Sequence, residues 1–205
     1  MSTVTLTSAS ALSAAPMPAW KRRTDLLLAG TLLVFCAPLF LFCWLAVRVT
    51  SRGPALHWSE RVGKDNRLFR MPKFRTMRVD TPQVATHLMH RPEHYLTPIG
   101  SFLRRTSLDE LPQLVSVWRG DLSLVGPRPA LFNQNDLVAL RTQNGLHRLL
   151  PGITGWAQIN GRDELEIPVK VRFDAEYMRR QSLGLDLKIL ALTLWQVVRS
   201  RGIRH

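Results

Sequence analysis

One long apolar run dominates the pattern of hydrophobic and polar positions, and it covers residues 26–47 without a charged side chain. The run is roughly 22 residues long, enough for a helix to cross about 30 Å of hydrocarbon. A secretory signal peptide would have a shorter apolar region and a basic segment at the very start of the chain. The pattern therefore predicts a membrane anchor, which we place at residues 21–50.

Pro38 lies in the middle of this run, where its missing N–H and its ring are expected to bend or break a helix. Basic residues flank the run on both sides, with 21–23 before it and Arg48 and Arg52 after it. The positive-inside rule would keep both flanks in the cytoplasm. A helix pair that enters and leaves by the same face satisfies the rule, whereas a kinked single span is the commoner arrangement. Charge and proline alone leave both open.

Shorter patterns follow residue 50. Leu111, Leu114, Val115 and Trp118 recur with helical spacing, which predicts an amphipathic helix ending near Gly120. We also predict an α/β fold, mainly helical with short strands, in which residues 51–205 form one compact domain. The other expected elements are a strand or extended segment over 67–77 interrupted at Pro72, a helix over 131–149, a glycine-rich loop or short extended segment over 151–162, a helix from Pro168 through Tyr177, and a helix over 185–199.

The two ends of the chain have contrasting patterns. Residues 1–20 carry no charged side chain and are rich in Ser, Thr, Ala and Pro, so they are predicted to be a disordered tail. The helix over 185–199 has a broad apolar face, with Trp195 and basic residues near its end. That pattern fits both a core helix and an amphipathic helix lying in the membrane interface.

The formal net charge of +13 implies an anionic partner. Nucleic acid, an anionic membrane surface and a phosphorylated substrate all fit that charge, and the apolar run favours the last two. A membrane-tethered nucleic-acid-binding module would gather basic residues and exposed aromatics on one element. Here the basic residues are dispersed and interrupted by acids, so we expect no nucleic-acid partner. Cys36 and Cys43 both lie in the apolar run and predict neither disulfides nor a metal site.

The candidate chemistry is concentrated at Asp109 and Glu110, which follow the basic pair Arg104 and Arg105. One interpretation is structural, because Ser107 and Glu110 have the spacing of a capping box. In the other, the positive end of the helix dipole favours an ionised Asp109, which then binds Mg²⁺ or attacks phosphorus. Adjacent side chains on a helix point about 100° apart, so the two acids should have different roles.

Arg128 is the second candidate, because Pro127 and Pro129 flank it and restrict its backbone. An arginine presented by a stiff loop suits bidentate recognition of phosphate. A turn with a solvated arginine is the equally simple alternative for this loop alone.

Five segments in order carry a resemblance to a known family: the proline-broken anchor, KFRTM (73–77), SLDELPQL (107–114), GDLSLVGPRP (120–129) and PGITGWAQINGR (151–162). Together they resemble the bacterial sugar transferases, which are monotopic polyprenol-phosphate phosphoglycosyl transferases. The resemblance covers nearly all of the chain after residue 20. It is closest to the minimal, single-anchor form of that family.

The resemblance implies transfer of a sugar-1-phosphate from a UDP-sugar to undecaprenyl phosphate, with release of UMP. It implies that Asp109 is the nucleophile, forming an aspartyl-phosphosugar, and a ligand of Mg²⁺, and that Glu110 assists it. This reaction would initiate assembly of an exopolysaccharide, O-antigen, capsule or glycoprotein glycan, with downstream glycosyltransferases as possible partners. A non-catalytic scaffold is the alternative. The substrate-binding residues implied are Arg104 and Arg128, with Arg162, Lys73 and Arg75 as looser matches.

The resemblance also implies that the break at Pro38 makes the anchor re-entrant. The catalytic domain would then lie on the cytoplasmic face of the bacterial inner membrane, in contact with lipid. The serine that often precedes this proline in the family is Ala37 here.

Overall fold

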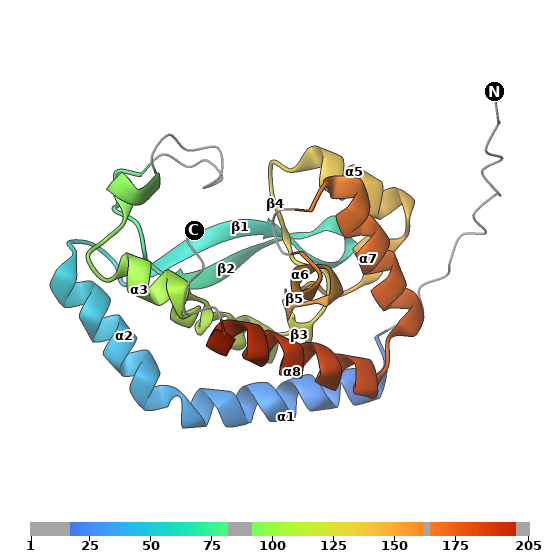
Figure 1. Cartoon of the computed structure of the whole chain (residues 1–205), viewed down its shortest axis with the longest axis horizontal. Helices are drawn as coiled ribbons and strands as arrows, with labels where there is room; N and C mark the ends of the chain where they lie inside the picture. Colours follow the sequence, from blue (N-terminus) through green and yellow to red (C-terminus); the bar gives the residue numbers. More distant parts are fainter. Residues whose placement is uncertain (1–16, 82–91, 162–164, 200–205) are drawn as a thin grey trace.

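A bent pair of helices forms the lower edge of the molecule in the computed structural model, which describes residues 17–81, 92–161 and 165–199 (Figure 1). Helix α1 (Ala19–Phe35) and helix α2 (Ala37–Thr50) meet at Cys36 with a bend of 62°. Pro38 lies in the first turn of α2, where a missing N–H removes no helical hydrogen bond. The predicted break is therefore confirmed. By length and apolar composition, no single described helix could cross a membrane, but this pair together could.

A three-stranded antiparallel sheet lies above the helix pair, in the order β2-β1-β4. Strands β1 (Leu56–Val62) and β2 (Leu68–Phe74) form a hairpin closed by the 3₁₀ turn η1 (Lys64–Asn66), and β4 (Ala130–Leu131) pairs with the end of β1. The interruption predicted at Pro72 is wrong, because β2 continues through it opposite Trp58. An edge strand tolerates proline, since one side of it makes no ladder hydrogen bonds.

The fold is mixed α/β and mostly helical, as predicted, and a second sheet pairs β3 (Ser123–Val125) with β5 (Gly152–Thr154) in parallel. The predicted helices near 111–120, 168–177 and 185–199 are confirmed, and Gly120 ends the first with φ 95°. These three are α4 (Gln113–Arg119), α7 (Ile167–Arg180) and α8 (Leu183–Arg199). The other described helices after α2 are α3 (Gly100–Arg105), α5 (Asn135–Gln143) and α6 (Trp156–Ile159), with 3₁₀ turns η3 (Pro92–Tyr95), η4 (Leu108–Glu110) and η5 (Leu146–Arg148).

The single helix expected over 131–149 is wrong. Leu131 belongs to strand β4, α5 covers only Asn135–Gln143, and Gly145 then adopts a left-handed backbone with φ 73° before η5. The segment 151–162, expected to be a loop or extended, instead divides into β5 and the one-turn helix α6. The extended expectation holds only for its first residues.

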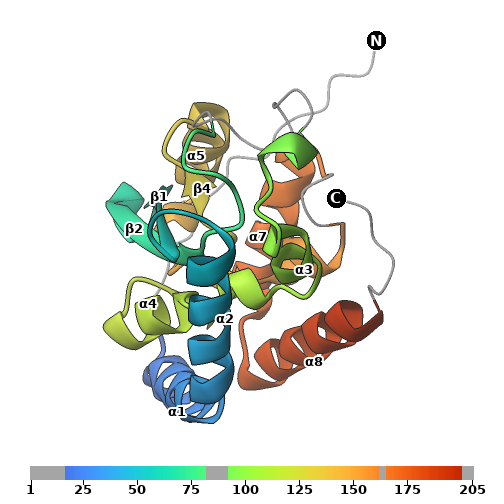
Figure 2. The ribbon, with the colours of Figure 1, turned by 90° about the vertical axis from the view of Figure 1, so that its left-hand side faces the viewer.

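Both helices of the bent pair contribute to the hydrophobic core. Ala29 of α1 belongs to a buried cluster with Val117 of α4 and Ile189 of α8. On the other arm, Val47 of α2 is buried with Phe74 of β2. Figure 2 shows α2 at the front with α4 and α3 on either side of it. The pair is thus packed onto the rest of the protein along both arms.

Candidate active site

Asp109 and Glu110 lie in the short turn η4, between α3 and α4. Ser107 enters this turn in a left-handed backbone conformation, with φ 56° and ψ 18°. The Ser107 side chain makes no capping hydrogen bond, and the Glu110 carboxylate is instead paired with Lys73. The capping-box interpretation is therefore wrong, and α4 itself begins only at Gln113, after Pro112.

Asp109 is buried, with 9% of its surface exposed. Burial raises the pKa of Asp109 to about 6, because loss of water disfavours the charged form; the nearby Glu110 adds to this, while Lys73 and Arg104 oppose it. The expectation that the helix dipole favours the ionised form is thus corrected, since burial outweighs it. Asp109 is still mainly ionised at pH 7.

Glu110 has the opposite environment. Its Oε1 accepts hydrogen bonds from Lys73 Nζ at 2.7 Å and Arg128 Nη2 at 3.5 Å. Burial alone would raise the pKa of Glu110, but these two cations lower it to about 2. Two adjacent carboxylates with separated pKa values suit different roles, as the sequence predicted.

The cations predicted to bind substrate do not all gather here. Lys73 and Arg128 contact Glu110, and Arg104 lies close enough to Asp109 that each shifts the pKa of the other. Arg104 also donates from Nε to Thr76 Oγ1 at 2.9 Å.

Arg75 lies elsewhere. Its guanidinium donates to the carbonyl of Arg52 at 2.6 Å and to the Ser51 hydroxyl at 2.8 Å, which ties the end of α2 to β2. Arg162 lies outside the described residues.

The loop around Arg128 is held by residues that sequence reasoning did not select. Arg141 Nη1 donates to the Arg128 carbonyl at 2.7 Å, and Arg61 Nη1 donates to the Pro129 carbonyl at 3.3 Å. Because the Arg128 side chain contacts Glu110, the interpretation as a simple solvated turn is wrong. No pattern in the sequence distinguishes Arg61 and Arg141 from the other arginines, since they act on main-chain atoms.

The donor set fits a magnesium ion shared with substrate. Magnesium binds oxygen donors and usually combines one or two carboxylates with substrate phosphates. Asp109 offers such oxygens, whereas Glu110 Oε1 already accepts from two cations. Within the described residues, no group of three or more His, Cys, Asp or Glu side chains could hold a metal ion alone.

Comparison with known proteins decides the family, because residues 17–200 match the profile described as bacterial sugar transferase. This chain belongs to the bacterial sugar transferase family. It is 41% identical over 210 residues to the undecaprenyl-phosphate glucose phosphotransferase of Komagataeibacter xylinus, covering 95% of this chain and 40% of that protein. It is 40% identical to the UDP-glucose:undecaprenyl-phosphate glucose-1-phosphate transferase of Escherichia coli (strain K12), covering 86% and 39%.

The chain therefore spans about two fifths of the length of these two relatives. A third relative is comparable in length: an uncharacterized sugar transferase of Bacillus subtilis (strain 168), EpsL, is 41% identical, and the match covers 90% of each chain.

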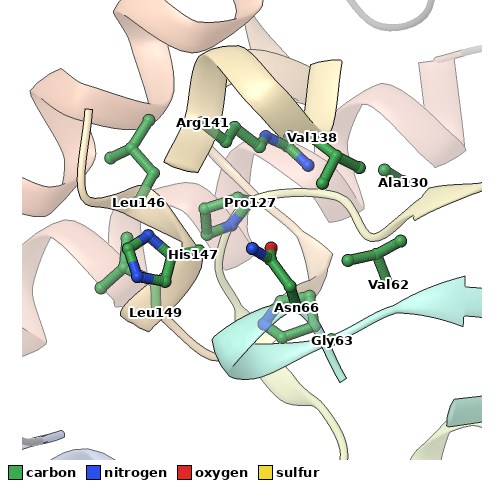
Figure 3. A pocket seen from close by; sticks show the side chains of 11 residues that line it. Val62, Gly63, Asn66, Pro127, Ala130, Val138, Arg141, Leu146, His147 and Leu149 are labelled. Atoms are coloured by element: carbon green, nitrogen blue, oxygen red, sulfur yellow. The ribbon is translucent and has the colours of Figure 1, made fainter. Parts of the chain in front are cut away.

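In this sugar transferase a small cavity lies behind the Arg128 loop (Figure 3). Its volume is about 30 Å³, room for little more than a water molecule. Pro127, Arg141, Asn66 and His147 contribute to its lining, and the acids of η4 do not. The cavity is therefore part of the support of the loop and too small for a nucleotide sugar.

Proposed function

We propose that this chain transfers a sugar-1-phosphate from a UDP-sugar to undecaprenyl phosphate. The observation that carries the proposal is the pairing of a buried carboxylate, Asp109, with a second carboxylate, Glu110, that is held by Lys73 and Arg128. The substrates are proposed from relatives: the Escherichia coli protein is a UDP-glucose:undecaprenyl-phosphate glucose-1-phosphate transferase, and the Salmonella typhimurium protein is an undecaprenyl-phosphate galactose phosphotransferase.

The chemistry proceeds in two displacements at phosphorus. An Asp109 oxygen attacks the sugar-linked phosphorus, the bond from that phosphorus to the bridging oxygen breaks, and UMP leaves with the electron pair. A phosphate oxygen of undecaprenyl phosphate then attacks the same phosphorus and displaces the Asp109 carboxylate. The product is a sugar joined to the lipid through a diphosphate, and Asp109 is regenerated.

The cations around the acids suit a substrate that carries a diphosphate. Arg104 and Arg128 would bind phosphate oxygens, and Lys73 keeps Glu110 charged and in place. Magnesium, when bound, supplies positive charge that neutralises the phosphates, and Asp109 is the residue that would hold it. Glu110 accepts hydrogen bonds from both Lys73 and Arg128, and these two bonds fix the orientation of the η4 turn.

The attachment of both ends of the bent pair to the rest of the protein supports a re-entrant anchor. Near the start of α1, Lys21 forms a buried ion pair with Asp186 of α8 at 2.6 Å. At the end of α2, Ser51 accepts a hydrogen bond from Arg75. Both ends are thus tied to one body, whereas Val34 and Phe35 at the bend are 79% and 82% exposed. We infer that the bend enters the lipid and both ends remain on the cytoplasmic face.

Helix α8 has the features of a core helix on one side and of an amphipathic interfacial helix on the other. Ile189 is fully buried in the core, while the opposite side exposes Leu187, Leu194 and Trp195. An exposed apolar face ending in tryptophan is typical of a helix at headgroup depth. We infer that this face rests on the membrane surface and helps keep the acids at the height of the lipid phosphate.

The test is intact-protein mass spectrometry after incubation with Mg²⁺ and a panel of UDP-sugars, without the lipid acceptor. We expect a mass increase equal to one phosphosugar, which disappears when undecaprenyl phosphate is added. Asp109→Asn should remain folded and membrane-bound but gain no mass, because an amide is a far weaker nucleophile. An adduct retained in Asp109→Asn would overturn the assignment, and full turnover without any adduct would indicate direct transfer.

A further inference from the structure

The loop that carries Arg128 is held by hydrogen bonds to three of its consecutive main-chain carbonyls. Gly152 N donates to the Pro127 carbonyl at 2.9 Å, Arg141 Nη1 to the Arg128 carbonyl at 2.7 Å, and Arg61 Nη1 to the Pro129 carbonyl at 3.3 Å. The two prolines have no N–H to donate, so carbonyls are the groups through which this loop is most easily fixed. The three donors come from β5, α5 and β1, three elements that surround the loop.

Arg141 is itself fixed by a buried carboxylate. Its Nε and Nη2 donate to Asp174 Oδ2 of α7 at 3.0 Å and 2.7 Å, and the side chains of Arg141 and Asp174 are 12% and 2% exposed. A planar guanidinium can bridge two acceptors in one fixed geometry, which a lysine cannot do. Figure 3 shows the Arg141 side chain extending from α5 above Pro127.

Rigidity and location are separate properties of this loop. Proline restricts φ within the loop, but it does not determine where the loop lies relative to η4. The donors from Arg141 and Arg61 do determine this, because they fix the carbonyls of two consecutive residues, Arg128 and Pro129. The Arg128 guanidinium then lies 3.5 Å from Glu110. Displacement of a binding group by about 1 Å is enough to slow an enzyme strongly.

We propose that Arg141, oriented by Asp174, and Arg61 are positioning residues for Arg128. They act through the main chain of the loop and hold the Arg128 guanidinium where it meets Glu110 and the diphosphate of the nucleotide sugar. This inference rests on the proposed function for the nature of the substrate. It adds residues of α5, α7 and β1 to those on which donor binding depends.

The variants are chosen to separate positioning from folding. Arg141→Lys keeps a positive charge near Asp174 but loses the planar fork that reaches both acceptors. Removing Arg141 alone would leave a buried, unpaired Asp174 and could unfold the protein. The double variant Arg141→Met with Asp174→Leu avoids that problem, because an apolar pair often replaces a buried ion pair without loss of stability. Arg148→Lys, at an exposed position of η5, is the matched control.

The measurements are the KM and kcat for the UDP-sugar that the wild-type protein uses, the affinity for UDP with Mg²⁺, and thermal unfolding in detergent. We expect both Arg141 variants to weaken UDP binding and raise KM by roughly tenfold, the effect of losing one hydrogen bond from a charged donor. Arg61→Lys should act in the same direction. Arg148→Lys should match the wild-type protein in all three measurements.

A double-mutant cycle with Arg128→Ala then decides the mechanism. If Arg141 acts through Arg128, Arg141→Lys should have little further effect on UDP affinity in the Arg128→Ala protein. Additive losses, or unchanged KM and UDP affinity with lowered thermal stability, would overturn the positioning role. A wild-type protein that binds UDP but transfers no sugar would overturn the proposed function instead, and the UDP affinities would still decide the role of Arg141.

Discussion

Asp109 and Glu110 are adjacent in the chain but have pKa values of about 6 and about 2. Burial dominates at Asp109, whereas Lys73 and Arg128 outweigh burial at Glu110. In the proposed role of nucleophile, a carboxyl group with a pKa just below neutral is ionised at pH 7 yet retains more reactivity than an ordinary carboxylate. Glu110 remains charged under the same conditions and keeps the cations in place.

The pKa of Asp109 leads to a prediction about pH. The proposed reaction needs the Asp109 carboxylate, so kcat/KM for UMP release should fall about tenfold per pH unit below pH 6. Lys73→Met should move this acid limb to higher pH, because Lys73 lowers the pKa of Asp109. Arg148→Met, away from the acids, should leave the limb unchanged. An acid limb near pH 4, the ordinary value for aspartate, would show that burial does not control Asp109.

At the scale of residues, motif order predicted the group formed by Asp109, Glu110, Lys73 and Arg128. Arg75 was assigned to the same group, but β2 ends at Phe74 and the chain then turns toward the end of α2. The supporting arginines could not be predicted at all. Arg61 acts on a main-chain carbonyl 68 positions away, and only tertiary folding brings the two together.

At the scale of elements, α4 connects the acids of η4 to the bent helix pair. Arg22 of α1 donates to the carbonyls of Val117 and Trp118, at 2.6 Å and 2.9 Å, which places a positive charge at the C-terminal end of α4. A side chain at Gly30 would begin 2.9 Å from the Trp118 ring, so a glycine allows α1 and α4 to approach. The position of the acids relative to the bend in the helix pair therefore depends on this helix contact.

A size exchange tests the contact between α1 and α4. Gly30→Leu should destabilise the protein by about 1–3 kcal/mol, the usual cost of overpacking a close contact. Adding Trp118→Ala should recover most of the loss, because it removes the ring that the new side chain meets. Thermal unfolding in detergent measures both, with Thr31→Leu at an exposed position of α1 as the control. Equal losses in the single and double variants would show that the contact does not limit packing.

Element boundaries were predictable where the sequence carries a local signal. Pro38, Gly120 and Pro168 each mark a helix boundary that the structure confirms. Residues 131–149 carry no such clear local signal, because an apolar pattern continues across Gly145 although the backbone turns there. Strand β4 is only two residues long and exists because β1 lies beside it, which no local pattern reveals.

At the scale of the whole molecule, the basic residues at the start of α1 have two uses. Lys21 is buried against Asp186, and Arg22 binds the end of α4, so these two charges belong to the fold as well as to the positive-inside count. Their partners lie in α8 and α4, on the same body that Arg75 ties to the end of α2. A straight span would have to break the contacts at one end and expose Lys21 and Asp186 unpaired. The arrangement of the whole molecule therefore favours the re-entrant anchor over a kinked span.

Labelling from one side of the membrane tests this arrangement. In a background with Cys36→Ala and Cys43→Ala, a cysteine is introduced at one of two exposed positions, as Arg23→Cys near the start of α1 or Arg52→Cys just after α2. In the re-entrant arrangement both positions lie on the cytoplasmic face of the membrane. A membrane-impermeant maleimide should therefore label neither protein in intact spheroplasts and both proteins in inverted membrane vesicles, where that face is turned outward. Labelling of Arg23→Cys in spheroplasts, with Arg52→Cys protected, would instead show a span that crosses the membrane. In such a span the start of α1 would lie on the other side of the membrane from α4 and α8. That result would therefore also show that the contacts of α1 with α4 and α8 are absent in the membrane.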